Sequence, residues 1–574
     1  MWKVSPAAPS RADPDLNGEK HLKRAFLKQT AGCLAGILTA AAVLAGCGRS
    51  ARSDGTVPSP TALTPVQTDA SDDYRTSYEI FVYSFCDSDG DGIGDLPGVL
   101  SKLDYINDGD PATVNDLDCD QIWLMPVCPS PTYHKYDVTD YCAIDPVYGT
   151  MEDFDALVEA CHARGIRVIV DLVVNHTSVE HPWFQAAAAY LRELPPDWGA
   201  SEDYCPEFGY YHFSREAQNG YAPLAGTNWY YEARFWEGMP DLNLDSNAVR
   251  SELSEVTEFW LRHGVDGFRL DAVTSYYTGD RNASVAFLSW LTSAVKTQSP
   301  EATLVGEAWA AQDEYARYYE SGIDSLFDFA FAGQDGIIAS VVKGNRPAAD
   351  FAAMMESEEQ LYASYNPSYV NAPFYTNHDM ARSTGYYAYD DGSRTKFAGA
   401  LNLLMTGNAF IYYGEEIGMK GSGKDENKRA PMFWTDGGAG ADGNCSGPPE
   451  MDRFDMKFPS LAAQQEDPAS VWQYYRDAVR MRRSIPVLAR GTTVPHPELS
   501  GDALCVFERQ APEGAAYKNA LVVINTGEEP QDLPLMETYK EPLCALVTGE
   551  ERVTVQQGTV HLPAFAVAVF SAEE

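Results

Sequence analysis

The chain has 574 residues, enough for more than one domain, and its 83 acidic residues outnumber its 42 basic residues to give a formal net charge of −41. A surface with this excess of carboxylates repels nucleic acid and anionic lipid, so we exclude both as partners. We interpret the charge as a solubilising acidic surface, and we expect a monomer.

The first segment of the chain is typical of an export signal. Basic "HLKRAFLK" (21–28) precedes the uncharged apolar run "TAGCLAGILTAAAVLAG" (30–46), which is too short for a comfortable membrane span. The run continues into "LAGC", which resembles the lipobox of bacterial lipoproteins, where the cysteine carries the lipid. We therefore predict a signal peptide over 1–46, lipidation of Cys47 and anchoring at the outer face of the cell membrane. A secretory signal with an incidental cysteine is the alternative.

Residues 47–73 are rich in proline, serine, threonine and aspartate, and this composition predicts a flexible tether. Of the 11 cysteines, Cys33 and Cys47 belong to the leader, and the others are scattered without a CxxC pair. We therefore predict neither a cysteine-bound metal nor a disulfide framework, and expect most of these thiols to be buried.

From Glu79 onward, short apolar runs alternate with amphipathic helical stretches. Eight runs are predicted to be strands: 79–85, 121–127, 166–176, 265–271, 302–309, 325–331, 371–379 and 408–416. Nearly all are apolar on both faces, which is typical of parallel strands covered by helices. A count of eight favours a closed (β/α)₈ TIM barrel over an open doubly wound sheet, and no glycine-rich phosphate loop follows the first strand. We assign the barrel, an α/β fold, to residues 74–175 and 246–488.

Two regions depart from this alternation. Residues 176–245 are irregular and rich in aromatic residues, which predicts a domain inserted after the third strand. Residues 489–574 contain short alternating strands separated by turns, which predicts a C-terminal antiparallel β-sandwich.

Charged side chains gather at the predicted carboxyl ends of the strands, where barrels of this kind place catalytic groups. Arg269 and Asp271 are two residues apart in the fourth strand, so their side chains share one face and are expected to pair. Three other strands deliver similar groups to the same rim: Asp171, Asn175, His176, Glu307, Asn377, His378 and Asp379. The chain has no serine elbow and no HExxH helix beside them, which disfavours acyl transfer and zinc hydrolysis.

Four of these strand ends carry motifs that, in this order and spacing, resemble the signature regions of the α-amylase family, glycoside hydrolase family 13. The motifs are "DLVVNH" (171–176), "GFRLDAV" (267–273), "LVGEAW" (304–309) and "FYTNHD" (374–379). "RAPMFW" (429–434) also fits. "MPDLN" (239–243) is similar to the motif of the subfamily intermediate between oligo-1,6-glucosidases and neopullulanases, which includes lipoprotein amylases. The likeness extends from about Tyr78 to the C-terminus.

The resemblance implies a role for each matching residue. Asp271 would be the nucleophile and Glu307 the acid/base of a retaining glycosidase, while Asp379 would favour the distorted sugar ring. Arg269 would keep Asp271 ionised, and burial would raise the pKa of Glu307. His176 and His378 would bind sugar hydroxyls, and Tyr136 would form a stacking floor. Taken alone, each residue could equally belong to a structural ion pair or be a satisfied core histidine, and that reading is kept for Asp171 and Asn175.

A second site is predicted at "DSDGDGIGD" (87–95), where aspartates alternate and a glycine follows. It is not an EF-hand, because Gly98 occupies the twelfth position. The α-amylase family has a calcium loop with this pattern, and the resemblance implies a structural Ca²⁺ held by Asp87, Asp89, Asp91, the Ile93 carbonyl and Asp95. A solvated acidic turn is the alternative, and we expect no organic cofactor.

The resemblance implies an α-amylase that cuts α-1,4-glucosidic bonds inside starch and maltodextrins. Many α-amylases carry Lys-His where this chain has Thr274 and Ser275, so the choice of bond and chain length is open. An α-glucosidase, a neopullulanase or a 4-α-glucanotransferase on the same scaffold are the near alternatives. A non-catalytic glucan-binding lipoprotein is the alternative from another class, although a binder has no need of all three acids.

Overall fold

The computed structural model describes residues 55–69, 71–195, 197–387 and 389–572. The predicted signal peptide, Cys47 and the start of the tether lie outside these ranges. Residues from Thr56 onward form one compact unit by their contacts. Among the described residues, no helix has the length and apolar character needed to cross a membrane.

Seven parallel strands form the central sheet, in the order β10-β1-β2-β3-β7-β8-β9. Their bounds are β1 Thr76–Ile80, β2 Gln121–Leu124, β3 Arg167–Leu172, β7 Gly267–Leu270, β8 Thr303–Gly306, β9 Ser325–Leu326 and β10 Ala409–Tyr412. The eighth stave is the segment 372–374, which makes isolated parallel bridges from Ala372 to Phe327 and from Phe374 to Phe410. These bridges join β9 to β10 and close the ring, so the predicted TIM barrel is confirmed.

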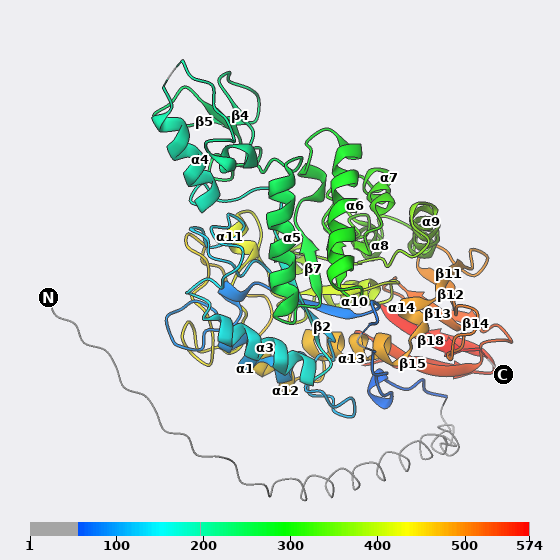
Figure 1. Ribbon diagram of the computed structural model, residues 1–574. Coiled ribbons are helices and arrows are strands. Elements are labelled where there is room, and N and C mark those ends of the chain that lie inside the picture. Colours follow the sequence, from blue (N-terminus) through cyan, green and yellow to red (C-terminus); the bar gives the residue numbers. More distant parts are fainter. Residues whose placement is uncertain (1–54, 70, 196, 388, 573–574) are drawn as a thin grey trace, which may run out of the picture. The chain divides into compact units, whose positions relative to one another are not determined.

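Helices cover the barrel on its outer side (Figure 1). The longer ones are α3 Met151–Ala163, α5 Asn247–Arg262, α6 Arg281–Gln298, α9 Ala349–Tyr365, α10 Ser393–Leu403 and α13 Val471–Ser484. The six residues of β3 are all buried, as expected for a strand between a packed barrel interior and a helical layer. Helix α3 begins with a capping box in which Thr150 and Asp153 bond each other's backbone N–H groups.

The first strand is shifted from its predicted range of 79–85. It spans Thr76–Ile80, and the chain then turns through a short 3₁₀ helix, Val82–Ser84. The strand begins in polar residues because the barrel interior satisfies them. Ser77 Oγ donates to Asn408 Oδ1 at 2.6 Å and accepts from Gln121 Nε2 at 2.8 Å. The apolar run begins after the strand does, so the range predicted from it is too late in the chain.

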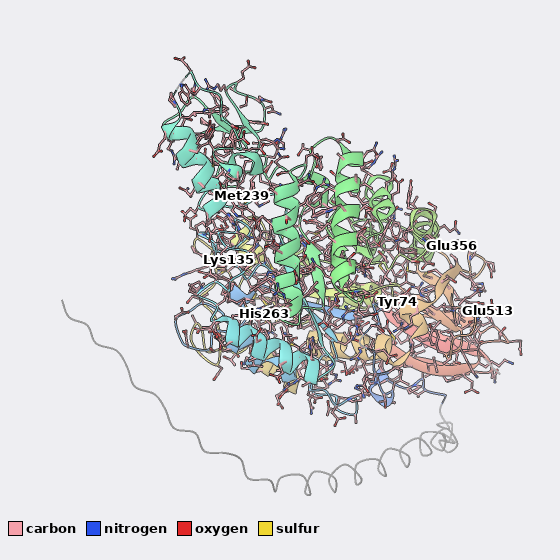
Figure 2. All side chains as sticks on the ribbon, in the orientation of Figure 1. Tyr74, Lys135, Met239, His263, Glu356 and Glu513 are labelled. Carbon is pink, nitrogen blue, oxygen red and sulfur yellow. The ribbon has the colours of Figure 1, made fainter. Side chains whose placement is uncertain are left out.

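The inserted domain contains α4 Pro182–Glu193 and a small antiparallel sheet of β4 Phe213–Ser214, β6 Tyr230–Glu232 and β5 Tyr221–Pro223. Aromatic rings form its core, with Phe184 packed edge-on against Tyr211 and Tyr231. Antiparallel bridges from His176 to Asp241 and from Tyr211 to Leu242 close its base, and the Leu242 N–H donates to the Asn175 carbonyl of the barrel at 2.9 Å. Figure 2 marks Met239 at this base.

The C-terminal region has two antiparallel sheets, as predicted. The five-stranded sheet has the order β11-β12-β13-β18-β15 and the three-stranded sheet β14-β17-β16. Their bounds are β11 Thr492–Pro495, β12 Leu504–Gln510, β13 Ala520–Asn525, β14 Gln531–Pro534, β15 Glu541–Val547, β16 Thr554–Gln556, β17 Thr559–Leu562 and β18 Ala566–Ser571. Buried side chains such as Val506, Leu533 and Val560 belong to one apolar cluster in this region.

The second half of the predicted tether is not free. Val57 is buried in the C-terminal cluster, and its N–H donates to the Val553 carbonyl at 2.9 Å. Further along, Arg480 Nε donates to the Leu63 carbonyl at 3.0 Å. The prediction of a flexible tether over 47–73 is therefore wrong from residue 56 onward, because a few apolar side chains in a polar stretch find buried places.

All nine cysteines of the described residues are free thiols, and eight of them are buried, with Cys142 exposed. The prediction that most of these thiols are buried is confirmed for this part of the chain.

Candidate active site

The structure brings the predicted rim residues together. Asp171 and Arg269 are register partners in the neighbouring strands β3 and β7. Asp271 and Glu307 directly follow the carboxyl ends of β7 and β8, and Asp379 follows the eighth stave. Parallel strands end at one face of the barrel, so residues more than a hundred positions apart in the chain meet there.

The Arg269 guanidinium is the centre of the site. It is fully buried and contacts three carboxylates: Nη1 lies 3.0 Å from Asp171 Oδ1 and 2.7 Å from Asp271 Oδ1, and Nη2 lies 2.8 Å from Glu307 Oε2. It also lies over the Trp123 ring, 5.1 Å from its centroid. One cation thus neutralises a cluster of acids that would otherwise repel each other. The carboxyls of Asp271 and Glu307 are held within the span of a single guanidinium.

Glu307 is set up to carry a proton near neutral pH. Burial raises its pKa to about 7, with the neighbouring Asp271 and Asp379 charges adding to the rise against the lowering effect of Arg269. Its Oε2 accepts a hydrogen bond of 3.1 Å from the Ala272 N–H. Ala272 has a φ of 44°, a left-handed conformation that is costly for a residue with a Cβ. This strained turn aims the Ala272 N–H at Glu307.

Asp379 lies between two cations. Burial on its own would raise its pKa, but His378 and Arg429 together hold that pKa well below the usual range. The ion-pair distances are 3.1 Å from Asp379 Oδ2 to His378 Nε2 and 2.7 Å from Asp379 Oδ1 to Arg429 Nη2.

His378 is itself held by a second carboxylate. Its Nδ1 lies 2.6 Å from Glu79 Oε1 in β1, and both side chains are almost fully buried. Burial would lower the pKa of His378, but Asp379 and Glu79 outweigh it and raise the pKa to about 10. His378 is therefore an imidazolium at neutral pH, with both ring nitrogens donating.

Tyr136 and His176 line the same cavity. The Tyr136 ring stacks on His378 with centroids 5.7 Å apart and planes at 16°, and its hydroxyl donates to Asp171 Oδ2 at 3.1 Å. His176 is buried, burial lowers its pKa, and its Nε2 has no hydrogen-bond partner among the described residues. A buried polar nitrogen without a partner, in the wall of a cavity, is suited to a ligand hydroxyl.

The cavity over these residues has a volume of about 500 Å³ and mixes aromatic and charged side chains. It is lined by His134, Tyr136, His176, Phe235, Met239, Asp271, Ala272, Thr274, Ser275, Glu307, Trp309, Asp379, Asp425 and Arg429. Phe235 and Trp309 are half exposed, and Trp309 stacks on Phe329 with centroids 5.1 Å apart. Flat, exposed rings beside hydrogen-bonding groups suit a ligand with both apolar faces and hydroxyls.

Sequence reasoning missed several residues of this site. Glu79 lies in an apolar run predicted to be a strand, so the sequence indicates no role for it. Its role is seen only in the structure, where its carboxylate lies beside His378. Arg429 lies in "RAPMFW", a motif whose resemblance to the family implies no role for the arginine. Phe235 gave no signal within the irregular insert. Asp171, by contrast, has the scaffolding role predicted for it, because it binds Arg269 and Tyr136.

The acidic loop 87–95 brings three of its predicted metal ligands together. Carboxylate oxygens of Asp87, Asp89 and Asp95 lie within 4.8 Å of one another, and none of the three forms an ion pair with another described residue. Asp87 and Asp95 are buried, and Asp87 accepts from the N–H groups of Gly90 and Gly92 at 2.7 and 2.9 Å. Asp91 is not part of this group and accepts instead from the Ile93 N–H at 2.7 Å. Converging oxygen ligands without an internal cation fit a hard divalent cation such as Ca²⁺.

Comparison with known proteins places this site in a family. The description "Alpha amylase, catalytic domain" matches residues 79–491. Over 420 residues the chain is 38% identical to Alpha-amylase 3 of Dictyoglomus thermophilum, covering 72% of this chain and 78% of that protein. It is 30% identical over 497 residues to Oligo-1,6-glucosidase of Heyndrickxia coagulans, covering 72% and 85%.

Among solved structures, Eubacterium rectale Amy13B superposes with a TM-score of 0.85 at 45% sequence identity. The superposition covers 90% of this chain and 99% of that one. The similarity therefore includes the inserted and C-terminal regions as well as the barrel.

Proposed function

Because this chain belongs to the α-amylase family and is a glycosidase, we propose that it hydrolyses α-1,4-glucosidic bonds within starch and maltodextrins, with retention at the anomeric carbon. The observation that carries this proposal is the pair of carboxyl groups, Asp271 and Glu307, held on the two arms of the Arg269 guanidinium. Retaining glycosidases need two carboxyl groups about 5–5.5 Å apart.

In the first step, the Asp271 carboxylate attacks the anomeric carbon and forms a covalent glycosyl ester. The glycosidic C–O bond breaks, its electron pair stays on the leaving oxygen, and Glu307 gives that oxygen its proton. In the second step, the Glu307 carboxylate takes a proton from water, whose oxygen attacks the anomeric carbon and displaces Asp271. Arg269 Nη1, 2.7 Å from Asp271 Oδ1, orients the Asp271 carboxylate for the attack. The pKa of Glu307, about 7, allows Glu307 to exchange a proton in both directions.

The remaining residues act on the sugar ring. Positive charge develops on the ring in the oxocarbenium-like transition state, and the Asp379 carboxylate lies ready to stabilise it while accepting from sugar hydroxyls. The unpartnered Nε2 of His176 is placed to hydrogen-bond a sugar hydroxyl. His378, predicted to do the same, has both ring nitrogens on Glu79 and Asp379, so its part is to position the Asp379 carboxylate. Tyr136 offers a ring face for the sugar to stack on.

The assignment is tested with Asp271→Asn, which keeps the shape of the side chain but removes the nucleophilic charge. On soluble starch the variant should release reducing sugar at least roughly 10³-fold more slowly than the parent protein. It should still bind maltodextrin. Equal activity of the variant and the parent protein would reject Asp271 as the nucleophile.

The bond preference is a finer question, because named relatives include both an alpha-amylase and an oligo-1,6-glucosidase. Thr274 and Ser275, in place of the Lys-His of many α-amylases, line the cavity. An α-glucosidase, a neopullulanase or a 4-α-glucanotransferase would use the same carboxyl groups. Product analysis on starch, pullulan and isomaltose separates them: an endo-α-1,4 enzyme forms mixed maltodextrins from starch and leaves isomaltose intact.

We also propose that the acidic loop binds a structural Ca²⁺ through Asp87, Asp89 and Asp95, with Asp91 and the Ile93 carbonyl as the further predicted ligands. The ion would neutralise this loop, and the hydrolytic steps above do not pass through it. Calorimetric titration of the chelator-treated protein with Ca²⁺ tests the site, and absence of a binding isotherm would refute it.

For the leader, we propose that Cys47 is lipidated and holds the enzyme at the outer face of the membrane. In cell fractionation, Cys47→Ser should move the protein from the membrane fraction to the soluble fraction. A protein that stays in the membrane fraction would argue against this anchor.

A further inference from the structure

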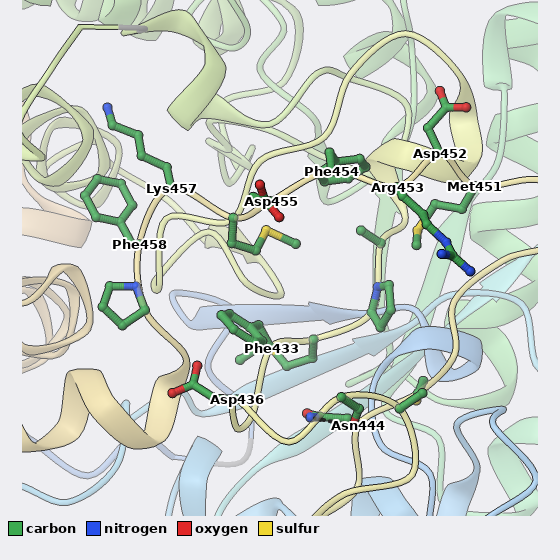
Figure 3. A pocket seen from close by; sticks show the side chains of 18 residues that line it. Phe433, Asp436, Asn444, Met451, Asp452, Arg453, Phe454, Asp455, Lys457 and Phe458 are labelled. Atoms are coloured by element: carbon green, nitrogen blue, oxygen red, sulfur yellow. Dashed lines mark hydrogen bonds between the residues drawn. The ribbon is translucent and has the colours of Figure 1, made fainter.

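A second cavity, larger than the catalytic one, lies in the segment between β10 and α12 (Leu461–Glu466). Its volume is about 810 Å³, within the range of roughly 300–1,000 Å³ typical of small-molecule sites. Figure 3 shows the side chains around it, and we call it the distal pocket. It is lined by Ala430, Pro431, Met432, Phe433, Asp436, Gly438, Ala439, Asn444, Cys445, Met451, Asp452, Arg453, Phe454, Asp455, Met456, Lys457, Phe458 and Pro459.

The lining combines flat apolar faces with available hydrogen-bonding groups. The rings of Phe433, Phe454 and Phe458 are only partly buried. Arg453 and Asp455 make no hydrogen bond or ion pair with other described residues. The N–H donors of the Arg453 guanidinium and the acceptor oxygens of the Asp455 carboxylate are therefore available to a ligand. A pyranose ring presents C–H faces that pack on aromatic rings and a rim of hydroxyls that donate and accept, so this mixture suits a sugar.

Internal hydrogen bonds brace one turn in the wall of the distal pocket. Asn444 is buried and braces one turn of it: its Nδ2 donates to the carbonyls of Thr435 at 2.9 Å and Gly438 at 3.0 Å. Its Oδ1 accepts from the Trp434 N–H at 3.1 Å. Lys457 lies over the Phe458 ring, 5.2 Å from its centroid. A pre-organised wall lowers the entropic cost of binding.

Consecutive residues of the chain line the catalytic cavity and the distal pocket. Asp425 and Arg429 line the catalytic cavity, and Ala430 and Pro431, the next residues, line the distal pocket. The two cavities share no lining residue, so they are neighbouring but separate. A polymer of repeated units can occupy both at once, and occupancy of one site raises the effective concentration of the polymer at the other.

We propose that the distal pocket binds a second stretch of the α-glucan substrate outside the catalytic cavity; this rests on the proposed function. Retention at the distal pocket helps long glucans, which span both sites, and gives no advantage to substrates too short to reach it. The expected signature is therefore a change that depends on substrate length.

The test compares Phe454→Ala and the double variant Phe454→Ala/Asp455→Asn with the full parent chain. Phe454 packs against the hydrophobic core from a partly buried position, so the apparent Tm of each variant is measured to show that it is folded at the assay temperature. The KM for soluble starch should rise about three- to tenfold, while kcat/KM for maltotriose stays constant. Tyr204→Ala, at an 81% exposed ring that lines neither cavity, is the matched control and should change neither value.

A second measurement uses the Asp271→Asn background, in which hydrolysis does not interfere. Affinity electrophoresis in gels containing starch should show retardation that Phe454→Ala reduces and Tyr204→Ala does not. Unchanged starch KM and retardation in the Phe454 variants, with hydrolysis intact, would overturn the distal site alone. Equal loss on starch and maltotriose would also overturn it, since the change would then act on the catalytic cavity. A parent protein that neither hydrolyses nor binds α-glucan would instead overturn the proposed function.

Discussion

Two clusters of carboxylates, the catalytic one and the acidic loop, are neutralised in different ways. In the catalytic cluster Arg269, Arg429 and His378 supply positive charge from within the protein. In the acidic loop, the three converging aspartates accept from backbone N–H groups and form no ion pair with another described residue. A cluster with built-in cations can tune each acid separately, whereas a cluster without them depends on an ion from solution. The first arrangement suits proton transfer and the second suits a structural metal.

The largest effect is expected where the internal cation is removed. Arg269→Met leaves three buried carboxyls without their counter-charge, so it should lower activity on starch by roughly 10³-fold or more and the free energy of unfolding by about 3–5 kcal/mol. Activity assays and chemical denaturation check both numbers. The matched control is Arg164→Met, which breaks the exposed Arg164–Asp104 pair at 2.7 Å and should cost less than about 1 kcal/mol. Equal losses in the two variants would contradict the central place of Arg269.

The next effect is a fall of activity on the alkaline side. Glu307 must be protonated to act as the acid, and its pKa is raised to about 7 by burial. Above that pH the protonated fraction drops, so kcat/KM should fall about tenfold for each further pH unit. The measurement is a pH profile on starch and on a substrate with an activated aryl leaving group, which needs no proton. A profile that falls equally steeply for both substrates would count against Glu307 as the acid.

A smaller effect is expected from the carboxylate behind the catalytic cluster. Glu79→Gln removes one of two charges that raise the pKa of His378 to about 10, so that pKa should drop toward neutrality. Activity should fall by roughly tenfold at alkaline pH and much less at acidic pH, where His378 is still charged. The pH profiles of variant and parent decide the matter, and a loss that is uniform across pH would indicate a merely structural role for Glu79.

The smallest effect on catalysis should come from emptying the acidic loop. Chelation of Ca²⁺ should lower the free energy of unfolding by about 2.7 kcal/mol relative to a Ca²⁺ concentration 100 times Kd, with kcat little changed while the protein stays folded. Asp89→Asn should make thermal unfolding insensitive to chelator. If chelation instead abolished turnover at a temperature where the protein is folded, the contrast between the two clusters would fail.

The fold was predictable where apolar runs coincide with strands, as in β3 and β10. The fold was less predictable where polar side chains lie inside the barrel. Ser77 and Glu79 are satisfied by partners more than 290 residues away in the chain, Asn408 and His378. The eighth stave was predicted as a strand over 371–379 but makes only isolated bridges. Such long-range pairing leaves no periodic signal in a local window.

The candidate site was predictable to the extent that its residues directly follow strands. Arg269, Asp271 and Glu307 were found because strand ends converge in a barrel. Arg429 and Phe235 come from long irregular segments, and nothing local to the sequence says which side chain of such a segment reaches the cavity. The same limit applies to the acidic loop, where alternation in the sequence suggested Asp91 but the observed turn directs its carboxylate to the Ile93 N–H.

If Cys47 carries the proposed lipid, the docking of Val57 onto the C-terminal strands limits the distance between the enzyme and the membrane. With a lipid on Cys47, only the eight peptide units from Cys47 to Gly55 precede the packed segment, and fully stretched they span no more than about 28 Å. The enzyme would then work within a short radius of the bilayer, on glucan that reaches the cell surface, and its diffusion would be that of its lipid.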